Sequence, residues 1–159
     1  MATNSADRVK FHSVYGTQRF KNNTIHEGTV ETDGTLEVLG NSTLTAGLTL
    51  GTQTVGAAGS DQAGAGAISA TGGAIVFVTG ADDAKGVRLP LLADVSIGQV
   101  IIICNNLSNK TLEVYPGSGD AVNVSSDDTA ITLAADTINL FIKMDAAEWF
   151  GAELPPIAA

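Results

Sequence analysis

Apolar and polar residues alternate in short runs along most of this chain, and Gly, Asn, Asp or Pro separates the runs. A period of two predicts strands with one buried face, and the separating residues predict tight turns. Regular short strands of this kind are typical of a β-sandwich or barrel. From Ile68 onward we expect strands at 74–79, 86–89, 99–105, 111–115, 121–124, 130–133, 137–144 and 148–151.

One apolar set within these strands is predicted to point inward and fill a small core. Its members are Val76, Val78, Leu89, Val100, Ile102, Leu112, Val114, Val122, Val124, Ile131, Leu133, Ile138, Leu140 and Ile142. Cys104 ends an apolar run, and we expect its thiol to be an inert part of the core. Trp149 is expected to pack in the core or at a subunit contact. Tyr115 should cover the core edge while its hydroxyl reaches a loop.

Residues 27–56 carry still shorter strand-like runs separated by glycine. Burying their six main apolar side chains contributes about 1.5–3 kcal/mol each, whereas ordering the backbone costs about 1–2 kcal/mol for every residue. The segment should therefore not fold alone, and we expect it to form trimer contacts, although an ordinary hairpin remains an alternative. The expected contact residues are Val30, Leu36, Val38, Leu44, Leu48 and Leu50.

The composition, with 18 glycines and abundant Ala, Thr and Ser, predicts an all-β fold. We expect an N-terminal extended arm and a short glycine-punctuated β segment, followed by a small β-sandwich or barrel, in an intertwined homotrimer. The predicted parts are a docking arm (1–26), a short-strand trimerisation segment (27–56), a Gly/Ala-rich linker or long surface loop (57–67), a β-sandwich or barrel module (68–154) and a Pro-containing tail (155–159).

Charge is distributed unevenly along a chain whose formal net charge is -9. Residues 1–26 hold four basic groups against one acidic group, a balance of +3, and the remainder holds four basic and sixteen acidic groups, a balance of -12. Aromatic residues lie among the basic ones, which favours docking on an acidic protein surface, although a solvated arm is the alternative. The acidic remainder disfavours nucleic acid. The expected docking residues are Arg8, Lys10, Phe11, Tyr15, Arg19, Phe20 and Lys21.

Candidate chemistry is sparse. The two histidines, His12 and His26, lie in or beside the arm, and the single cysteine excludes an intrachain disulfide, so we expect no enzyme activity, no metal and no other cofactor. The acid pairs Asp82-Asp83 and Asp127-Asp128 are interpreted as solvated turn residues, with weak Ca²⁺ binding or glycoside hydrolysis as alternatives. We expect neither a secretory signal nor a membrane segment.

Three stretches of the C-terminal half resemble a family of short virion proteins of tailed bacteriophages. They are Lys85-Gly86-Val87-Arg88-Leu89-Pro90, the run from Thr111 to Asp120, and the run from Ile138 to Phe150 with its late Glu148-Trp149-Phe150. An apolar strand at Gly98–Asn105 lies between the first two, in the order typical of the family. Such proteins occur as capsid decoration (cement) proteins and as modules of head or tail fibres, commonly as homotrimers.

The resemblance implies a decoration protein that binds the outer capsid surface as a trimer and stabilises the shell. Its partners would be the major capsid protein and further copies of itself, with no nucleic acid and no membrane. Its location would be the virion, after synthesis in the host cytoplasm. A head- or tail-fibre component that contacts the host is the alternative, and a carbohydrate-binding module is a further one.

Overall fold

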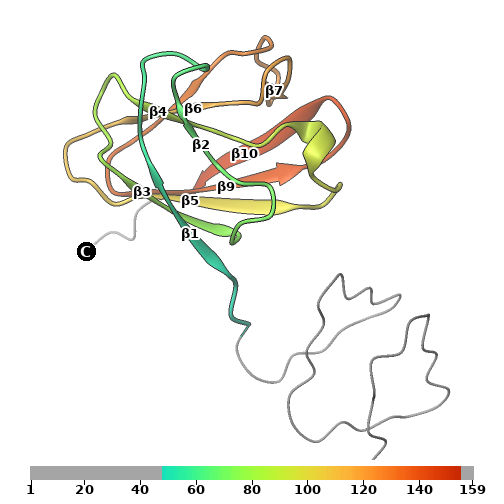
Figure 1. Ribbon diagram of the computed structural model, residues 1–159, viewed down its shortest axis with the longest axis horizontal. Helices are drawn as coiled ribbons and strands as arrows, with labels where there is room; N and C mark the ends of the chain where they lie inside the picture. Colours follow the sequence, from blue (N-terminus) through green and yellow to red (C-terminus); the bar gives the residue numbers. More distant parts are fainter. Residues whose placement is uncertain (1–47, 155–159) are drawn as a thin grey trace, which may run out of the picture. The chain divides into compact units, whose positions relative to one another are not determined.

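The computed structural model describes residues 48–154, which form one compact unit (Figure 1). This region is all-β, as the sequence predicted, apart from one short 3₁₀ turn. The eight strands predicted from Ile68 onward are confirmed as β3–β10, and two further short strands precede them. The elements are β1 (Thr52–Gly56), β2 (Gly66–Ala67), β3 (Ile75–Thr79), β4 (Gly86–Arg88), η1 (Leu92–Asp94), β5 (Val100–Asn105), β6 (Leu112–Tyr115), β7 (Ala121–Val122), β8 (Ile131–Leu133), β9 (Thr137–Lys143) and β10 (Glu148–Leu154).

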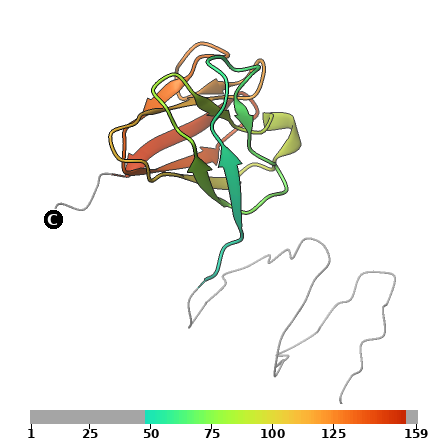
Figure 2. The same ribbon diagram turned by 60° about the vertical axis from the view of Figure 1, so that its left-hand side comes forward.

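The first six strands form a flattened coil that alternates between two sheets. Strands β1, β3 and β5 pair in parallel in one sheet, and β2, β4 and β6 pair in parallel in the other. Each turn of the coil therefore adds one strand to each sheet, as in a short solenoid. Figure 2 shows the two layers from the side, with β1 entering at the edge of the first sheet.

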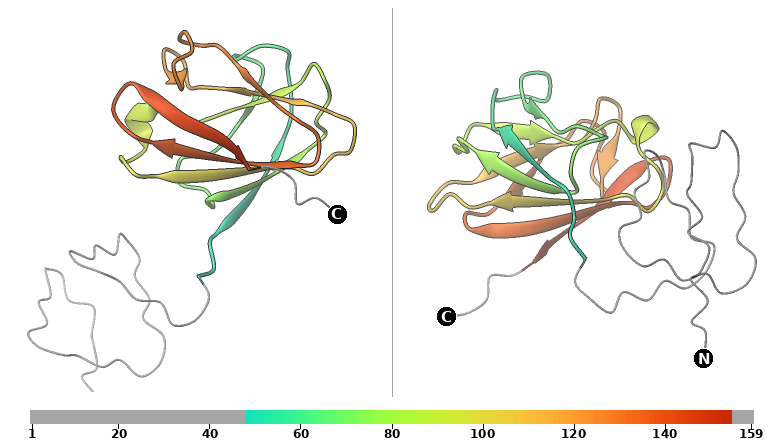
Figure 3. Two further views of the ribbon diagram at one scale, coloured as in Figure 1. Left: turned by 180° about the vertical axis from the view of Figure 1, so that it is seen from behind. Right: turned by 60° about the horizontal axis from the view of Figure 1, so that its bottom comes forward.

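The last strands close the coil by antiparallel pairing. Strand β8 pairs with β6, β9 pairs with β5, and β10 pairs with β9. The final orders are β1-β3-β5-β9-β10-β7, which we call sheet A, and β2-β4-β6-β8, which we call sheet B. Sheet A is the broad layer of red, yellow and green strands seen from behind in Figure 3.

The core lies between the two sheets. Sheet A contributes Val76, Val78, Ile101, Ile103, Phe141 and Trp149, and sheet B contributes Val87, Leu112, Val114 and Leu133. Trp149 is fully buried, so the prediction that it packs is confirmed as a core contact. The hydroxyl of Tyr115 donates to the carbonyl of Ser60 at 3.2 Å, which confirms that it reaches a loop.

The predicted inward set is wrong for two central strands. In β5 the buried residues are Ile101, Ile103 and Asn105, whereas Val100 and Ile102 are half-buried on the opposite face. Strand β9 is inverted in the same way: Thr137, Asn139, Phe141 and Lys143 are buried, whereas Ile138, Leu140 and Ile142 lie on the outer face. Cys104 shares that outer face and is half-buried rather than a core residue. Val124, also predicted inward, is 99% exposed.

Several buried polar groups in these strands make local hydrogen bonds, although Asn105 Oδ1 and Trp149 Nε1 have no partner among the described residues. Asn105 donates through Nδ2 to the carbonyls of Lys110 and Ala134, each at 3.0 Å. Asn139 donates to the Thr137 hydroxyl at 3.0 Å, and that hydroxyl donates to the Ala134 carbonyl at 2.8 Å. Polar residues can therefore face inward here, because a partnered polar group loses little on burial, while the large rings of Phe141 and Trp149 fill the core.

Residues 57–67 are an integral part of this folded unit, which agrees with the long surface loop that the sequence allowed and not with the linker. The Ala57 amide donates to the Thr79 carbonyl at 2.8 Å, and Ala58 bridges to Gly86. Ala65 is buried, and β2 ends the segment by pairing with β4. Likewise, the end of the predicted trimerisation segment is β1 of sheet A. Both segments belong to the folded unit because their main chain pairs with neighbouring turns of the coil.

Candidate functional site

The outer face of sheet A is the most unusual surface of the described region. Cross-strand register aligns its side chains in three rows. These rows are Val100-Ile142-Phe150, Ile75-Ile102-Leu140-Ala152 and Phe77-Cys104-Ile138-Leu154. We call these eleven residues the apolar face, and none of them carries a charge.

Much of the apolar face is open to solvent within residues 48–154. Phe77 is 44% exposed, Ile138 46%, Phe150 53% and Leu154 46%. The other large members are half-buried by their own strand neighbours. Single exposed apolar residues are ordinary on protein surfaces, but a contiguous set across four strands marks an interaction surface.

Sheet B has the opposite character on its outer face. Arg88, Glu113, Tyr115 and Thr132 point away from the core there. The Thr132 hydroxyl donates to the Glu113 carboxylate at 2.7 Å. A polar outer face of this kind is what a sheet in contact with water carries. The contrast makes the apolar face of sheet A a specific feature rather than a general property of the chain.

The hollows on the described surface include the following two. One, of about 330 Å³, lies at the end of the apolar face, where Phe77, Cys104 and Ile138 meet Asn106 and Asp136. The other, of about 320 Å³, is lined mainly by apolar residues of the β2–β3 and β4–β5 connections. Its lining includes Ile68, Arg88, Leu89, Pro90, Asp94 and Ser118. The first hollow adds concave shape to the apolar face.

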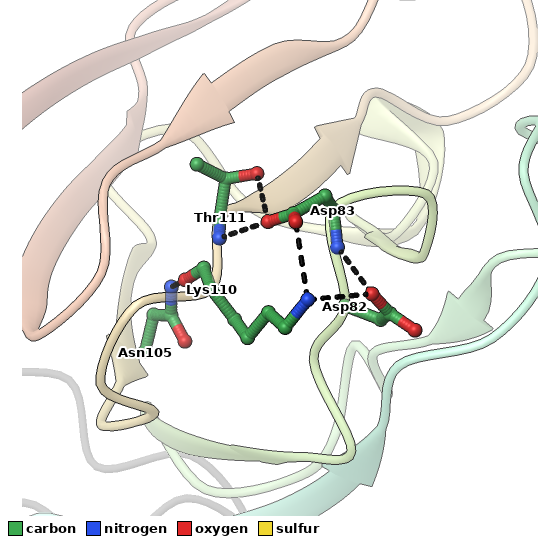
Figure 4. Close-up of polar contacts among 5 residues, drawn as sticks. All are labelled: Asp82, Asp83, Asn105, Lys110 and Thr111. Carbon is green, nitrogen blue, oxygen red and sulfur yellow. Dashed lines mark hydrogen bonds and ion pairs between the residues drawn. The ribbon is translucent and has the colours of Figure 1, made fainter.

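The acid pair Asp82-Asp83 ties two turns together (Figure 4). Asp83 accepts from the Thr111 amide at 3.0 Å, the Thr111 hydroxyl at 3.2 Å and the Lys110 ammonium at 3.1 Å. Asp82 accepts from the same ammonium at 3.3 Å and from the Asp83 amide at 2.9 Å. These contacts fix the β3–β4 turn to the β5–β6 turn, which agrees with the interpretation of both acids as turn residues.

Hydrogen bonding shifts the acid–base equilibria of this cluster. The Thr111 amide, followed by the Lys110 ammonium, lowers the pKa of Asp83 below its ordinary value. In return, Asp83 and then Asp82 raise the pKa of Lys110. The groups are therefore held as a charged pair at neutral pH.

The second acid pair also has a structural partner. Asp128 accepts from the Gly119 amide and from the Gln62 side chain, both at 2.7 Å. These bonds lower the pKa of Asp128, the Gly119 amide having the larger effect. Gln62 additionally donates to the Pro116 carbonyl at 3.1 Å and the Gly117 carbonyl at 3.3 Å. The cluster therefore fastens the 57–67 loop to the turns around β7.

The residues predicted from sequence to mediate docking and trimer contact fall mainly outside the described residues. Arg8, Lys10, Phe11, Tyr15, Arg19, Phe20, Lys21, Val30, Leu36, Val38 and Leu44 all lie there. Leu48 is exposed and Leu50 is half-buried, and both precede β1. The assignment of these residues therefore stays a prediction.

Sequence reasoning missed the apolar face, although a signal for it was present. Val100–Cys104 is apolar at every position, and a continuous apolar run is typical of a strand covered on both sides. The alternation in β10 gives a second signal, since Phe150, Ala152 and Leu154 share one face. Neither signal predicts a surface by itself, because the pairing of β3, β5, β9 and β10 decides which of these residues are neighbours.

Within residues 48–154, no three His, Cys, Asp or Glu side chains come together in a way that could hold a metal ion. The same residues include no helix with the length and apolar character of a membrane span. No family model matches this chain, and neither the curated proteins nor the solved structures contain a match. The resemblance to phage virion proteins therefore remains a prediction from sequence.

Proposed function

We propose that this chain is a capsid decoration protein of a tailed bacteriophage, which binds the outer surface of the shell as a homotrimer and stabilises it. The observation that carries the proposal is the uncharged, exposed apolar face on an otherwise acidic chain. Such a surface suits lasting association with other subunits. The sequence stretches that resemble virion proteins support the same function, because they coincide with β4, β6 and the β9–β10 hairpin, which build the body.

The proposed role is mechanical. A shell under internal pressure tends to separate at the contacts between its subunits. A protein that binds only the assembled shell stabilises it by mass action. The free energy gained rises with the logarithm of the ratio between the free concentration of that protein and its Kd. Three arms on one trimer bind at high effective concentration, so each arm contact can be modest.

The partner in this proposal is the major capsid protein, and the arm of residues 1–26 makes the contact. Its basic and aromatic residues, among them Arg8, Phe11, Arg19 and Phe20, are the types that anchor protein interfaces. The +3 balance of the arm suits an acidic capsid surface, whereas the acidic body would be repelled from that surface.

The test uses undecorated shells and the purified full chain. Co-sedimentation should show saturable binding, and bound shells should withstand a higher temperature before releasing their contents. A chain lacking residues 1–26 should keep its oligomeric state and lose shell binding. Binding retained by that variant would contradict the role of the arm, and no binding by the full chain would contradict the proposed function.

The fibre alternative makes a different prediction for the intact virion. Antibody raised against this chain should label the whole shell of a phage that carries it if the chain is a decoration protein. A fibre component would be labelled at only a few points, and that outcome would replace the present proposal.

A further inference from the structure

We infer that the apolar face of sheet A is the surface through which two copies of this chain contact each other. This contact involves residues of β3, β5, β9 and β10, whereas the sequence suggested Val30, Leu36, Val38, Leu44, Leu48 and Leu50 for trimer contacts. Its expected number of subunits, three, rests on the proposed function; the three apolar faces then meet around the threefold axis, each against its two neighbours. The occupant itself, a second copy, is argued from area, charge and strand composition.

The area is suited to a subunit contact. Because about half of each of four large side chains is open to solvent, the apolar face exposes on the order of 500 Å² of apolar surface. That is in the upper part of the range of about 300–600 Å² for the largest apolar patch of a monomer, a patch that is often functional, and it is more than half of the roughly 800 Å² that each partner buries in an interface of standard size. Residues at the margin, such as Met144, which is 58% exposed, extend the same surface.

The charge distribution favours a second copy over an unrelated basic partner. The eleven residues of the apolar face contain no acid and no base, although the chain carries a net charge of -9. A basic partner would find nothing to pair with on this face. A second copy, in contrast, brings an equally uncharged apolar surface, and the acidic residues Asp145 and Glu148 lie beyond the first row, in the β9–β10 turn and at the start of β10.

The composition of the central strand points the same way. Val100–Cys104 is apolar on both faces, as in strands that are buried on both sides, yet residues 48–154 cover only its inner face. Packed sheets lie about 10 Å apart with interdigitated side chains. The hollow beside Phe77, Cys104 and Ile138 can accept a large apolar side chain from the second copy.

The experiment measures self-association of the full chain by sedimentation equilibrium and native mass spectrometry. Ile138→Glu places a charge in the third row, and Phe150→Glu places one in the first row. Each should raise the dissociation constant of the oligomer at least 100-fold. Val124→Glu is the matched control, because Val124 is an exposed apolar residue outside the apolar face. That variant should stay within threefold of the wild type.

Salt provides an independent readout. Apolar contact between two acidic copies should strengthen as salt screens their like charges. Association that weakens with salt would overturn the inference, because it would indicate a contact carried by opposite charges.

Cys104, the single cysteine of the chain, reports directly on coverage of the apolar face. Its thiol should react with a maleimide at least tenfold more slowly in the associated wild type than in Ile138→Glu at the same concentration. Equal rates would overturn the inference. Far-ultraviolet circular dichroism of each variant verifies that it is folded, and Ile138→Thr serves as a milder substitution if Ile138→Glu does not fold.

The outcomes separate this inference from the proposed function. A wild-type chain that remains monomeric at tens of micromolar overturns the contact between copies, whatever covers the face instead. Unchanged association of Ile138→Glu and Phe150→Glu overturns the location while leaving shell binding to be judged separately. Loss of association in both variants, together with no binding of the wild type to undecorated shells, supports the contact and contradicts only the decoration function.

Discussion

The ammonium group of Lys143 donates a 2.6 Å hydrogen bond to the backbone carbonyl of Leu92. A second bond, of 2.9 Å, reaches the carbonyl of Val95. From the other side, the Asp120 carboxylate accepts from the Leu92 amide at 2.8 Å. The short 3₁₀ turn is therefore held by Lys143 of β9 and by Asp120, which precedes β7, and the ammonium group of Lys143 is hydrogen-bonded although the residue is buried.

Replacing Lys143 by methionine should lower the free energy of unfolding by about 2 kcal/mol, because hydrogen bonds made by a charged donor typically contribute about 1.5–3 kcal/mol. Methionine keeps most of the aliphatic volume, so the loss reports on the bonds rather than on packing. Urea unfolding at fixed protein concentration measures it. The exposed Lys85→Met is the control and should change stability by less than about 0.5 kcal/mol. A Lys143→Met protein as stable as the wild type would contradict the structural role.

Gln62 provides a test of whether residues 57–67 belong to the fold. Gln62→Ala removes donors to the Pro116 and Gly117 carbonyls and should cost about 1–2 kcal/mol. Amide hydrogen exchange in residues 57–65 should become faster than in the wild type, since the loop loses its attachment to the turns around β7. Asn106→Ala, at an exposed position, should leave exchange in that loop unchanged. Fast exchange already in the wild type would favour the linker interpretation.

Gly66 lies where neighbouring turns of the coil approach most closely. A Cβ atom at this position would overlap the carbonyl oxygen of Gly56, which is backbone and cannot move aside easily. Gly66→Ala should therefore destabilise the fold by at least about 2 kcal/mol. Gly56→Ala is the matched control, because its nearest neighbour would be the Thr79 hydroxyl at 3.9 Å. The midpoint of thermal unfolding should be clearly lower for Gly66→Ala than for Gly56→Ala. Equal midpoints would contradict the close approach of the two backbones.

The lowered pKa of Asp83 predicts a pH dependence of stability. Since the folded protein binds this proton less tightly than the unfolded chain, the stabilising contribution is complete above the ordinary carboxyl value. It declines as the pH falls below about 4 and is lost once the pH passes the lower folded pKa. Asp83→Asn should therefore be less stable than the wild type at pH 7, and the difference should shrink below pH 4.

The control for Asp83 is Asp127→Asn, another exposed acid of a turn. At pH 7 this variant should be as stable as the wild type, because surface substitutions away from a bonded group change stability little. Added salt should reduce the effect of Asp83→Asn only in part, because salt screens the Lys110 pair but leaves the hydrogen bond from the Thr111 amide in place. A difference from the wild type that is constant with pH would contradict the assignment.

Much of the local structure could be predicted from sequence, and the reason is local chemistry. Alternating apolar residues bounded by turn formers located β3–β10, and the backbone dihedrals bear out several turns. Asn109, Asp128 and Asp136, which lie between predicted strands, adopt positive φ, which asparagine and aspartate tolerate better than other non-glycine residues. Asn123 also adopts positive φ, but it lies within the strand predicted at 121–124, which ends at Val122. The proposed contact surface was not predictable in the same way. In the sequence, Ile138, Leu140 and Ile142 alternate with other residues as regularly as any buried set, yet they lie on the outer face of β9.

The sequence by itself determined that this protein is built from short strands, where most of them lie, and that its charge is strongly acidic. It could not decide which face of β5 and β9 meets the core. That choice depended on partners far along the chain: Phe141 and Trp149 fill the space between the sheets, and Lys143, Asn139 and Asn105 find backbone or side-chain acceptors there. Alternation specifies that two faces differ, whereas only the packing of both sheets selects the one that is buried.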